Sequence, residues 1–515
     1  MEFPLLPTKI IVTVLILGFL GLLVSLFEAL ILKPERLRSK LRKHGISGPP
    51  PSILLGNIPE MKKVQSQKSK LRREGEQVII HNCCSAVFPF LDQWRKQYGS
   101  TFMFSLGSIQ ILHISNPDLV KQITLCTSLD LGKPSYQHKE NGPLLGKGIL
   151  TSNGAIWAYQ RKILAPELYM EKVKGMMNLM AQSSVTVVES WNGKIESEGG
   201  VADIKIDGYM RRFSGDVISR ACFGSNYAKG EEIFLKFRDL KEAMSRKFLS
   251  GIPGIRYIPI KANREGWRLE KEIRALILKV VKERKEAKSE KDLLQMILES
   301  ATSSDLGQAA TDRFIVDNCK NIYLAGYETT AVSATWTLML LASNPEWQDK
   351  ARAEVLEICG VEFPDNDMLR KMKTLTMVIN ESLRLYPPVP IVSRELLESM
   401  KFGDIQVPKG VTIWTLVATL HQHPDIWGPD ADKFNPSRFA NGVAAACKFP
   451  CVYMPFGVGP RICLGQNFAM AELKIILALI LSNFRFSLSP KYMHSPTMRL
   501  VIEPEHGVNL LVKKL

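Results

Sequence analysis

The sequence lacks the patterns that mark several common protein classes. Its nine cysteines are scattered along 515 residues, and none of them forms a Cys-x-x-Cys pair. An odd, scattered set in a long chain argues against a disulfide framework and indicates reduced thiols. There is also no zinc-finger spacing, no RNA-binding aromatic motif, no sustained basic helix and no internal repeat. The net charge of +16 therefore points to an anionic membrane or an acidic protein partner, and we expect no nucleic-acid partner.

One long apolar run lies near the N-terminus. Residues 10–32 are apolar apart from a few positions, chiefly Glu28, and a run of this length spans a bilayer as a helix. A cleaved signal peptide would have a shorter apolar core, followed by a small-residue cleavage site. Here the run ends instead in Lys33–Lys43, which holds six basic residues and one acidic residue. Positive charge behind a span places that side in the cytosol, so we expect residues 1–32 to be an uncleaved, single-pass anchor.

A proline-rich connector follows the anchor. Pro49, Pro50 and Pro51 stop any helix and form a stiff, extended segment. We expect residues 33–75 to be a basic and proline-rich hinge. Residues 76–515 are then the globular part, which is long enough to bury a large core.

The globular part mixes two periodicities. Alternation on both sides of Gly107-Ser108 predicts a β-hairpin, with strands 101–106 and 109–114. Helical spacing of apolar residues dominates after Asn116. The sequence therefore predicts a mainly α fold with a small β part. The expected helices include 86–98, 169–187, 231–248 and 271–287, and the expected later strands are 400–407 and 411–416.

The stretch from Phe456 to Gly465 is the most informative in the chain. Glycines and a proline break regular structure, and the apolar spacing that follows predicts a helix over 466–481. Cys463 thus stands beside a helix N-terminus, where backbone N–H groups and the nearby Arg461 favour the thiolate and predict a lowered thiol pKa. With glycines leaving room for a flat partner, such a thiolate could hold a haem iron. A lone cysteine among apolar residues, however, is usually only a small buried hydrophobe.

A second polar stretch, Ala325–Thr330, lies inside a long apolar helix predicted over 313–342. A helix that is apolar nearly all round is buried, so an acid and two hydroxyls at its centre are costly unless they are used. The small residues here would let a flat body approach. The hydroxyls of Thr329 and Thr330 can bond to the preceding turn and bend the helix, so a harmless polar break is the alternative.

Two further pairs of residues share a helix face. Glu381 and Arg384 stand at i and i+3 in a half-buried helix, and a buried pair needs further hydrogen-bond partners to offset desolvation. Arg438 is the candidate third member. Trp157 and Arg161 stand at i and i+4, which by itself also fits a cation–aromatic surface pair.

The histidines at 421 and 423 form a His-x-His that could suggest a metal site. No carboxylate or cysteine is spaced to complete such a site. We therefore interpret both histidines as structural.

The spacing Phe-x-x-Gly-x-Arg-x-Cys-x-Gly is met by Phe456, Gly459, Arg461, Cys463 and Gly465. This resembles the haem-thiolate signature of the cytochrome P450 family, and the other motifs follow in that family's order. The resemblance implies a helical bundle around haem b (iron protoporphyrin IX) with minor β-sheets, behind one transmembrane helix. It covers the chain from the anchor to the C-terminus.

The resemblance also assigns roles residue by residue. Cys463 would be the axial ligand of the haem iron, with Phe456 and Gly465 beside it in the haem-binding loop. Trp157, Arg161, Arg394 and Arg461 would contact the haem propionates. Glu328 and Thr329 would relay protons to dioxygen, while Glu381, Arg384 and Arg438 would brace the core. The candidate substrate wall comprises Leu144, Leu145, Tyr327 and residues 388–392.

A finer resemblance is to the gibberellin- and terpenoid-oxidising group of the plant seventy-two clan. It rests on residues 45–52, 90–99 and 314–323. It implies an enzyme of the endoplasmic reticulum membrane with a cytosolic catalytic domain. NADPH–cytochrome reductase would supply electrons, and O2 would hydroxylate or epoxidise a small hydrophobic terpenoid. A gibberellin or related ent-kaurane diterpenoid acid is the favoured substrate.

Three alternatives stay open. Members of the same group oxidise pentacyclic triterpenoids, so a triterpenoid acid is a second substrate class. A haem-thiolate lyase or isomerase would need no external oxygen, but such relatives commonly lose the acid–alcohol pair. A membrane-tethered, non-catalytic haem-binding protein would show no substrate-dependent turnover with reductase and NADPH.

Overall fold

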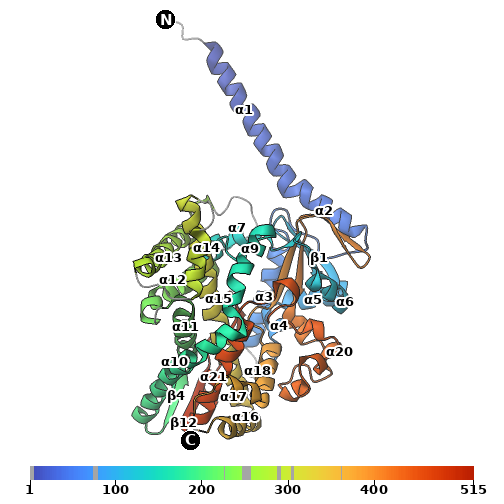
Figure 1. The fold of residues 1–515 in the computed structure, drawn as a ribbon. Coiled ribbons are helices and arrows are strands. Elements are labelled where there is room, and N and C mark those ends of the chain that lie inside the picture. Colours follow the sequence, from blue (N-terminus) through green and yellow to red (C-terminus); the bar gives the residue numbers. More distant parts are fainter. Residues whose placement is uncertain are drawn as a thin grey trace.

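A computed structural model describes residues 5–73, 79, 81–224, 227–245, 257–286, 292–302, 307–360 and 362–515. One long N-terminal helix stands away from a large helical body (Figure 1). The helices are α1 (Leu5–Phe27), α2 (Lys33–Arg42), α3 (Ile58–Arg73), α4 (Cys83–Val87), α5 (Pro89–Tyr98), α6 (Pro117–Leu125), α7 (Ser135–Glu140), α8 (Gly142–Leu145), α9 (Gly154–Leu164), α10 (Met170–Ser197), α11 (Asp207–Phe223), α12 (Tyr227–Ser245), α13 (Lys261–Glu286), α14 (Leu293–Thr302), α15 (Gln308–Ser343), α16 (Pro345–Cys359), α17 (Asn366–Lys371), α18 (Lys373–Leu385), α19 (Val417–His421), α20 (Pro424–Trp427) and α21 (Gln466–Asn483).

The described residues also form four small sheets. The strands are β1 (Thr101–Leu106), β2 (Ile109–Ile114), β3 (Leu131–Gly132), β4 (Val201–Lys205), β5 (Ile391–Leu396), β6 (Met400–Phe402), β7 (Ile405–Val407), β8 (Thr412–Leu416), β9 (Phe484–Leu488), β10 (Pro496–Met498), β11 (Ile502–Pro504) and β12 (Asn509–Lys514). The largest sheet has the order β1-β2-β8-β5-β3, and a second sheet has the order β4-β12-β9. The mainly α fold with a small β part is confirmed.

The apolar N-terminal run is helical and continuous with the basic segment behind it. A π-helical turn, Glu28–Leu32, joins α1 to α2. Residues Ile10–Arg42 form one helix that is long and apolar enough to cross a membrane, and its most apolar stretch is not buried by the rest of the protein. At its end, Leu41 is fully buried against the body. The stretch expected as a hinge therefore contains two helices, α2 and α3.

The predicted hairpin forms with the expected register. Thr101 pairs with Ile114, and Leu106 pairs with Ile109. The sheet then extends in parallel from β2 to β8 and antiparallel from β8 to β5. This arrangement sets Arg394 of β5 opposite Ile413 of β8.

Most predicted helices are present, with shifted ends. The helix expected over 86–98 is two helices, because Pro89 lacks an N–H group and begins a new helix after Phe88. Part of the helix expected over 231–248 is α12, and its last residues lie outside the described part of the chain. The long helix expected over 313–342 is α15, which begins five residues earlier.

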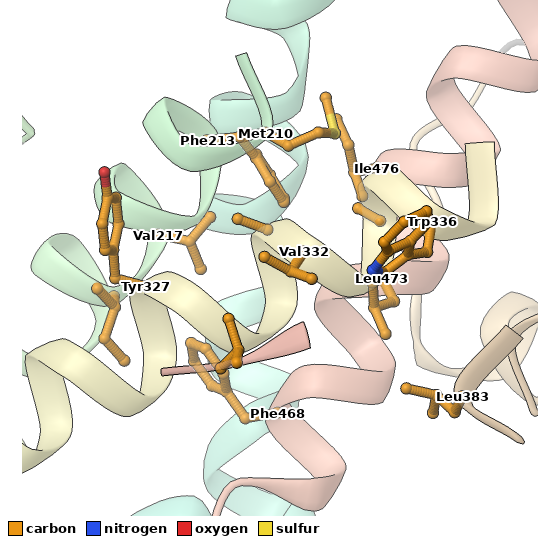
Figure 2. Close-up of a cluster of buried hydrophobic side chains, with 14 of the residues drawn as sticks. Met210, Phe213, Val217, Tyr327, Val332, Trp336, Leu383, Phe468, Leu473 and Ile476 are labelled. Atoms are coloured by element: carbon orange, nitrogen blue, oxygen red, sulfur yellow. The ribbon is translucent and has the colours of Figure 1, made fainter. Parts of the chain in front are cut away.

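Helix α15 is the centre of the core. It is buried nearly all round, as expected for a helix without a polar face. Figure 2 shows Val332 of α15 among side chains from α11 and α21, including Phe213, Phe468 and Leu473. This packing holds the middle of α15 against the start of α21, the helix that follows Cys463.

Candidate active site

A cavity of about 310 Å³ lies between the loop that carries Cys463 and the middle of α15. Segments far apart in the sequence meet at its wall, namely α9, α15, β5 and the start of α21. Much of the wall is apolar, with Ile149, Ile218, Ile322 and Phe468 among its members. A largely apolar cavity with a few polar groups is the usual form of a small-molecule site.

The cysteine loop presents Cys463 to this cavity. The backbone N–H of Cys463 donates to the carbonyl oxygen of Phe456 at 2.8 Å, which closes the loop. Gly457 has φ +73°, a left-handed conformation that favours glycine. A Cβ atom on Gly465 would meet nothing within 4 Å, so the wall beside the thiol is open.

The predicted fall in the pKa of the Cys463 thiol is wrong for the protein by itself. Cys463 is open to the cavity but enclosed by protein, and this desolvation raises the thiol pKa. The backbone N–H of Gly465 and the charge of Arg161 lower it again, by less. Desolvation thus outweighs the helix terminus. A bound metal ion would reverse this balance, because a coordinating thiol is deprotonated outright.

Four basic side chains line the cavity that Cys463 also lines. Three are the expected Arg161, Arg394 and Arg461, and the fourth is Lys133, which the sequence analysis missed. Among the ion pairs of the described residues, none of the four has a carboxylate partner. Burial, then the charges of Arg394 and Arg461, lower the pKa of Lys133 to about 7. A cluster of unpaired cations predicts an anionic ligand.

Trp157 organises this cluster. The guanidinium of Arg461 lies 4.2 Å from the centre of the indole ring, and that of Arg161 lies 5.8 Å from it. Arg161 also donates to the carbonyl oxygen of Ile462 at 2.9 Å. The tryptophan is 8% exposed. The pair therefore belongs to the cavity wall, and the alternative of an isolated surface pair does not hold.

The polar stretch of α15 divides between two faces of the helix. Thr329 and Thr330 line the cavity together with Ala325 and Gly326. The hydroxyl of Thr329 donates to the carbonyl oxygen of Ala325 at 2.7 Å, the back-bonded geometry expected of a mid-helix threonine. A Cβ atom on Gly326 would lie 2.6 Å from the side chain of Ile218, so any larger residue here would force Ile218 to move.

Glu328 faces away from the cavity. Its carboxylate lies 3.0 Å from the ammonium of Lys241 on α12 and 3.9 Å from Arg211 on α11. Both cations also contact Glu503 of β11, at 3.2 Å and 2.8 Å. The acid and the alcohol that the sequence placed side by side are therefore separated in space, and Glu328 belongs to a buried ion-pair network.

Comparison with known proteins decides the family. A family model described as Cytochrome P450 matches residues 82–512. The chain belongs to the cytochrome P450 family. It is 52% identical over 492 residues to cytochrome P450 714C2 of Oryza sativa subsp. japonica, with 94% of each chain covered. It is also similar to cytochrome P450 714B3 of Zea mays (46% identical, 98% of this chain and 96% of the relative) and to cytochrome P450 714A2 of Arabidopsis thaliana (44% identical, 97% of each).

The protein is thus a plant cytochrome P450 monooxygenase of the 714 type, a family that binds haem b and uses O2 and a redox partner. The cavity fits that cofactor. It offers one cysteine thiol, an open glycine beside it, and an unpaired cation cluster to match two propionate groups. A flat macrocycle needs such clearance, and arginine forks bind carboxylates bidentately.

Two of the three residues expected to brace the core, Glu381 and Arg384, are fully buried. Arg384 donates to both carboxylate oxygens of Glu381, at 2.7 and 2.8 Å. It also donates to the carbonyl oxygens of His421 and Ala431, at 2.7 and 2.6 Å. Arg438 approaches Glu381 at 3.4 Å. The expected third member is therefore in place, and the extra carbonyl partners offset the desolvation of the pair.

His421 links this brace to the cysteine loop. Its Nε2 accepts a hydrogen bond from the backbone N–H of Met454 at 3.0 Å, and its Nδ1 lies 3.3 Å from the carbonyl oxygen of Arg384. Burial lowers the pKa of His421 to about 3, so the ring is neutral. No group of three or more side chains that could hold a metal ion occurs among the residues that the structure describes.

Glu472 is a second buried acid that the sequence analysis missed. It lies on α21, is fully buried, and neither carboxylate oxygen has a hydrogen-bond partner among the described residues. Burial raises the pKa of Glu472 well above its ordinary value, while the nearby hydroxyl of Thr330 lowers it less. Glu472 lies at the centre of the apolar run 466–481. An acidic residue inside an apolar helix is the same sequence signal that pointed to Glu328, and it could have predicted Glu472 as well.

The expected substrate wall is partly wrong. Pro388, Val389, Ile391 and Val392 line the cavity, but Leu144, Leu145 and Tyr327 are not on its wall. Tyr327 stacks on Phe234 with ring centres 4.5 Å apart. It sits on the opposite face of α15 because a helix turns about 100° per residue.

Proposed function

We propose that this cytochrome P450 inserts one atom of O2 into a small hydrophobic terpenoid, by hydroxylation or epoxidation. A gibberellin or a related ent-kaurane diterpenoid acid is the favoured substrate. One observation carries the proposal: a single cavity pairs Cys463 and four unpaired cations with a wall of apolar side chains. Cys463 and the four cations suit haem b, and the apolar wall suits a fused-ring hydrocarbon skeleton.

The roles follow from the positions of the side chains. Cys463 would hold the haem iron through its sulfur, with Phe456 and Gly465 in the haem-binding loop. The propionates would be held by the basic cluster and its tryptophan: Lys133, Trp157, Arg161, Arg394 and Arg461. When bound, haem b activates O2 for insertion into a C–H or C=C bond. The apolar wall excludes water from the substrate, which keeps that chemistry from being lost to solvent.

Thr329 would hold a proton at its hydroxyl on the cavity wall. Glu328 would supply protons behind it, but its carboxylate must first leave Lys241, 3.0 Å away. In this structure the carboxylate of Glu328 is therefore held in an ion pair with Lys241. Glu381, Arg384 and Arg438 would act on structure alone.

The electron donor would be NADPH–cytochrome reductase, and the location would be the endoplasmic reticulum membrane, with the catalytic domain in the cytosol. The apolar helix Ile10–Arg42 and the basic residues at its end support this topology. We take residues 1–32 as the anchor, 33–75 as the connector and 76–515 as the catalytic domain.

The test is turnover by the full chain in microsomes with reductase and NADPH. A panel of gibberellins, kaurenoid acids and pentacyclic triterpenoid acids should include a diterpenoid acid that gives an oxygenated product carrying one atom from labelled O2. If only a triterpenoid acid were turned over, the substrate class would be triterpenoid acids and not diterpenoid acids. If the protein bound haem but showed no substrate-dependent NADPH use, it would be a non-catalytic haem-binding protein, and the proposed enzymatic activity would be wrong.

A further inference from the structure

Asn153 stands at the start of α9, but its side chain does not cap that helix. An asparagine at this position usually accepts hydrogen bonds from backbone N–H groups of the first helical turn. Asn116 does so at the start of α6, where its side chain accepts from Asp118 and Leu119 at 3.0 and 3.1 Å. The side chain of Asn153 makes no such bond. Its amide is therefore used for other contacts.

The amide of Asn153 joins two members of the cation cluster, which comprises Lys133, Arg161, Arg394 and Arg461. Its Oδ1 accepts the backbone N–H of Lys133 at 2.5 Å and the Nη2 group of Arg461 at 3.0 Å. Its Nδ2 donates to the carbonyl oxygen of Lys133 at 2.8 Å. Since the partners of Oδ1 can only donate and the partner of Nδ2 can only accept, the orientation of the amide is fixed. Both lone pairs of Oδ1 are then occupied.

The surrounding backbone is fitted closely around this amide. A Cβ atom on Gly132 would lie 2.7 Å from the side chain of Asn153, so a side chain at that position would displace the amide. Gly132 belongs to β3, which pairs with β5, the strand that carries Arg394. The carbonyl oxygen of Ser152 accepts a second hydrogen bond from Arg461, at 3.2 Å. These contacts connect the end of β3, the start of α9 and the cysteine loop.

Asn153 is not on the cavity wall, whereas Lys133 and Arg461 are. It can therefore act on a ligand in the cavity only through these two residues. An aspartate would accept the same hydrogen bonds, but its charge would pair with Arg461 and compete with an anionic ligand. The neutral amide holds the guanidinium without neutralising it. Both cations are thus oriented and still available to an anion.

We propose that Asn153 is a positioning residue for the cofactor, which orients Lys133 and Arg461 to bind the carboxylate groups of haem b. This inference rests on the proposed function, in which the cation cluster holds the propionates. Charged donors that are already oriented lose less conformational freedom when they bind a carboxylate. Loosening them should weaken the binding of the propionates and leave the apolar contacts of the macrocycle unchanged.

The experiment compares haem b with its dimethyl ester, in which both propionates are esterified and uncharged. Each is loaded into the full-length protein, and its rate of loss is measured by transfer to excess apomyoglobin. In the unaltered protein the ester should leave about tenfold faster than haem b, because it lacks the bonds to charged groups. Asn153→Leu should reduce this ratio of rates about fivefold or more, mainly by speeding the loss of haem b.

Asn116→Leu is the matched control. It also removes a half-buried asparagine at the start of a helix, but Asn116 touches no member of the cation cluster through its printed hydrogen bonds and is not on the cavity wall. It should change both rates by a similar factor and keep their ratio. A preserved ratio in Asn153→Leu, or an equal fall in Asn116→Leu, would overturn the inference.

Asn153→Asp decides the question if the leucine variant does not fold. It keeps an acceptor for Lys133 and Arg461, so a merely structural role would leave the ratio unchanged and the inference would be wrong. As a carboxylate it should pair with Arg461 and lower the ratio, which would support the inference. Loss of haem-loaded protein in both variants would make Asn153 structural and would also overturn it. Equal rates for haem b and its ester in the unaltered protein would instead overturn the proposed propionate contacts themselves.

Discussion

The ammonium of Lys241 on α12 lies 3.0 Å from the carboxylate of Glu328 on α15, and both side chains are buried. The acid next to Thr329 is thereby tied to a different helix. Arg211, at 3.9 Å, is the other cation near this carboxylate. Since an unpaired buried charge is far more costly than a paired one, this contact decides where Glu328 can point.

Lys241→Met should destabilise the protein by about 3–5 kcal/mol, because it leaves Glu328 with one distant cation. Thermal unfolding of the haem-loaded protein measures the loss. The double variant Lys241→Met with Glu328→Gln should recover much of it, since the uncompensated charge is gone. If the two changes were simply additive, Glu328 and Lys241 would not be coupled as the structure indicates.

Cys463→Ser should abolish the thiolate-type absorbance band of the reduced carbon monoxide complex, because serine cannot supply a thiolate ligand. The matched control is Cys451→Ser, whose thiol is half-buried and is not on the cavity wall. The control should keep the band. A band that survived in Cys463→Ser would mean that another cysteine is the ligand.

Thr329→Val keeps nearly the same volume and removes one hydroxyl from the cavity wall. Substrate binding should change little, so the substrate-induced absorbance shift should persist. Without the hydroxyl, proton delivery to the cavity should be slower, and more of the reduced oxygen should be released as hydrogen peroxide. The measurement is the ratio of product formed to NADPH consumed, which we expect to fall. An unchanged ratio would show that the hydroxyl serves only its 2.7 Å bond to Ala325.

Glu381→Ala should prevent accumulation of folded, haem-loaded protein, because Arg384 would stay buried without its carboxylate partner, at a cost of about 3–5 kcal/mol. The exposed pair Glu398–Lys409, 2.6 Å apart, offers the control. Glu398→Ala should cost no more than about 1 kcal/mol, since exposed ion pairs contribute little. Normal haem content with slow turnover in Glu381→Ala would indicate a catalytic role instead.

Glu472 should make stability depend on pH in a direction that can be tested. Its pKa in the folded protein is raised well above 4.5, the ordinary value that applies in the unfolded chain. Above pH 4.5 the unfolded chain releases this proton while the folded protein keeps it, so the contribution to stability falls as pH rises. The Tm of Glu472→Gln relative to the unaltered protein should therefore increase from pH 5 towards neutrality. A constant difference would contradict a neutral, buried acid.

The sequence by itself determined the features that rest on local spacing. The loop from Phe456 to Gly465, the helix after it, the hairpin around Gly107 and the apolar N-terminal helix all follow from neighbouring residues. Glu381 and Arg384 could be paired because a helix brings i and i+3 together. These features were enough to predict the family and the mainly α fold.

Only the tertiary structure decided which remote groups surround each side chain. Lys241, 87 positions away in sequence, holds the carboxylate of Glu328 in an ion pair away from the cavity. No local sequence pattern predicts this contact. Lys133, the residue after β3, joins the cation cluster on the cavity wall. Enclosure by protein raises the pKa of the Cys463 thiol, which the helix terminus alone would lower. Electrostatic environment and side-chain direction depend on long-range packing, because desolvation and charge partners come from segments that the motif itself does not contain.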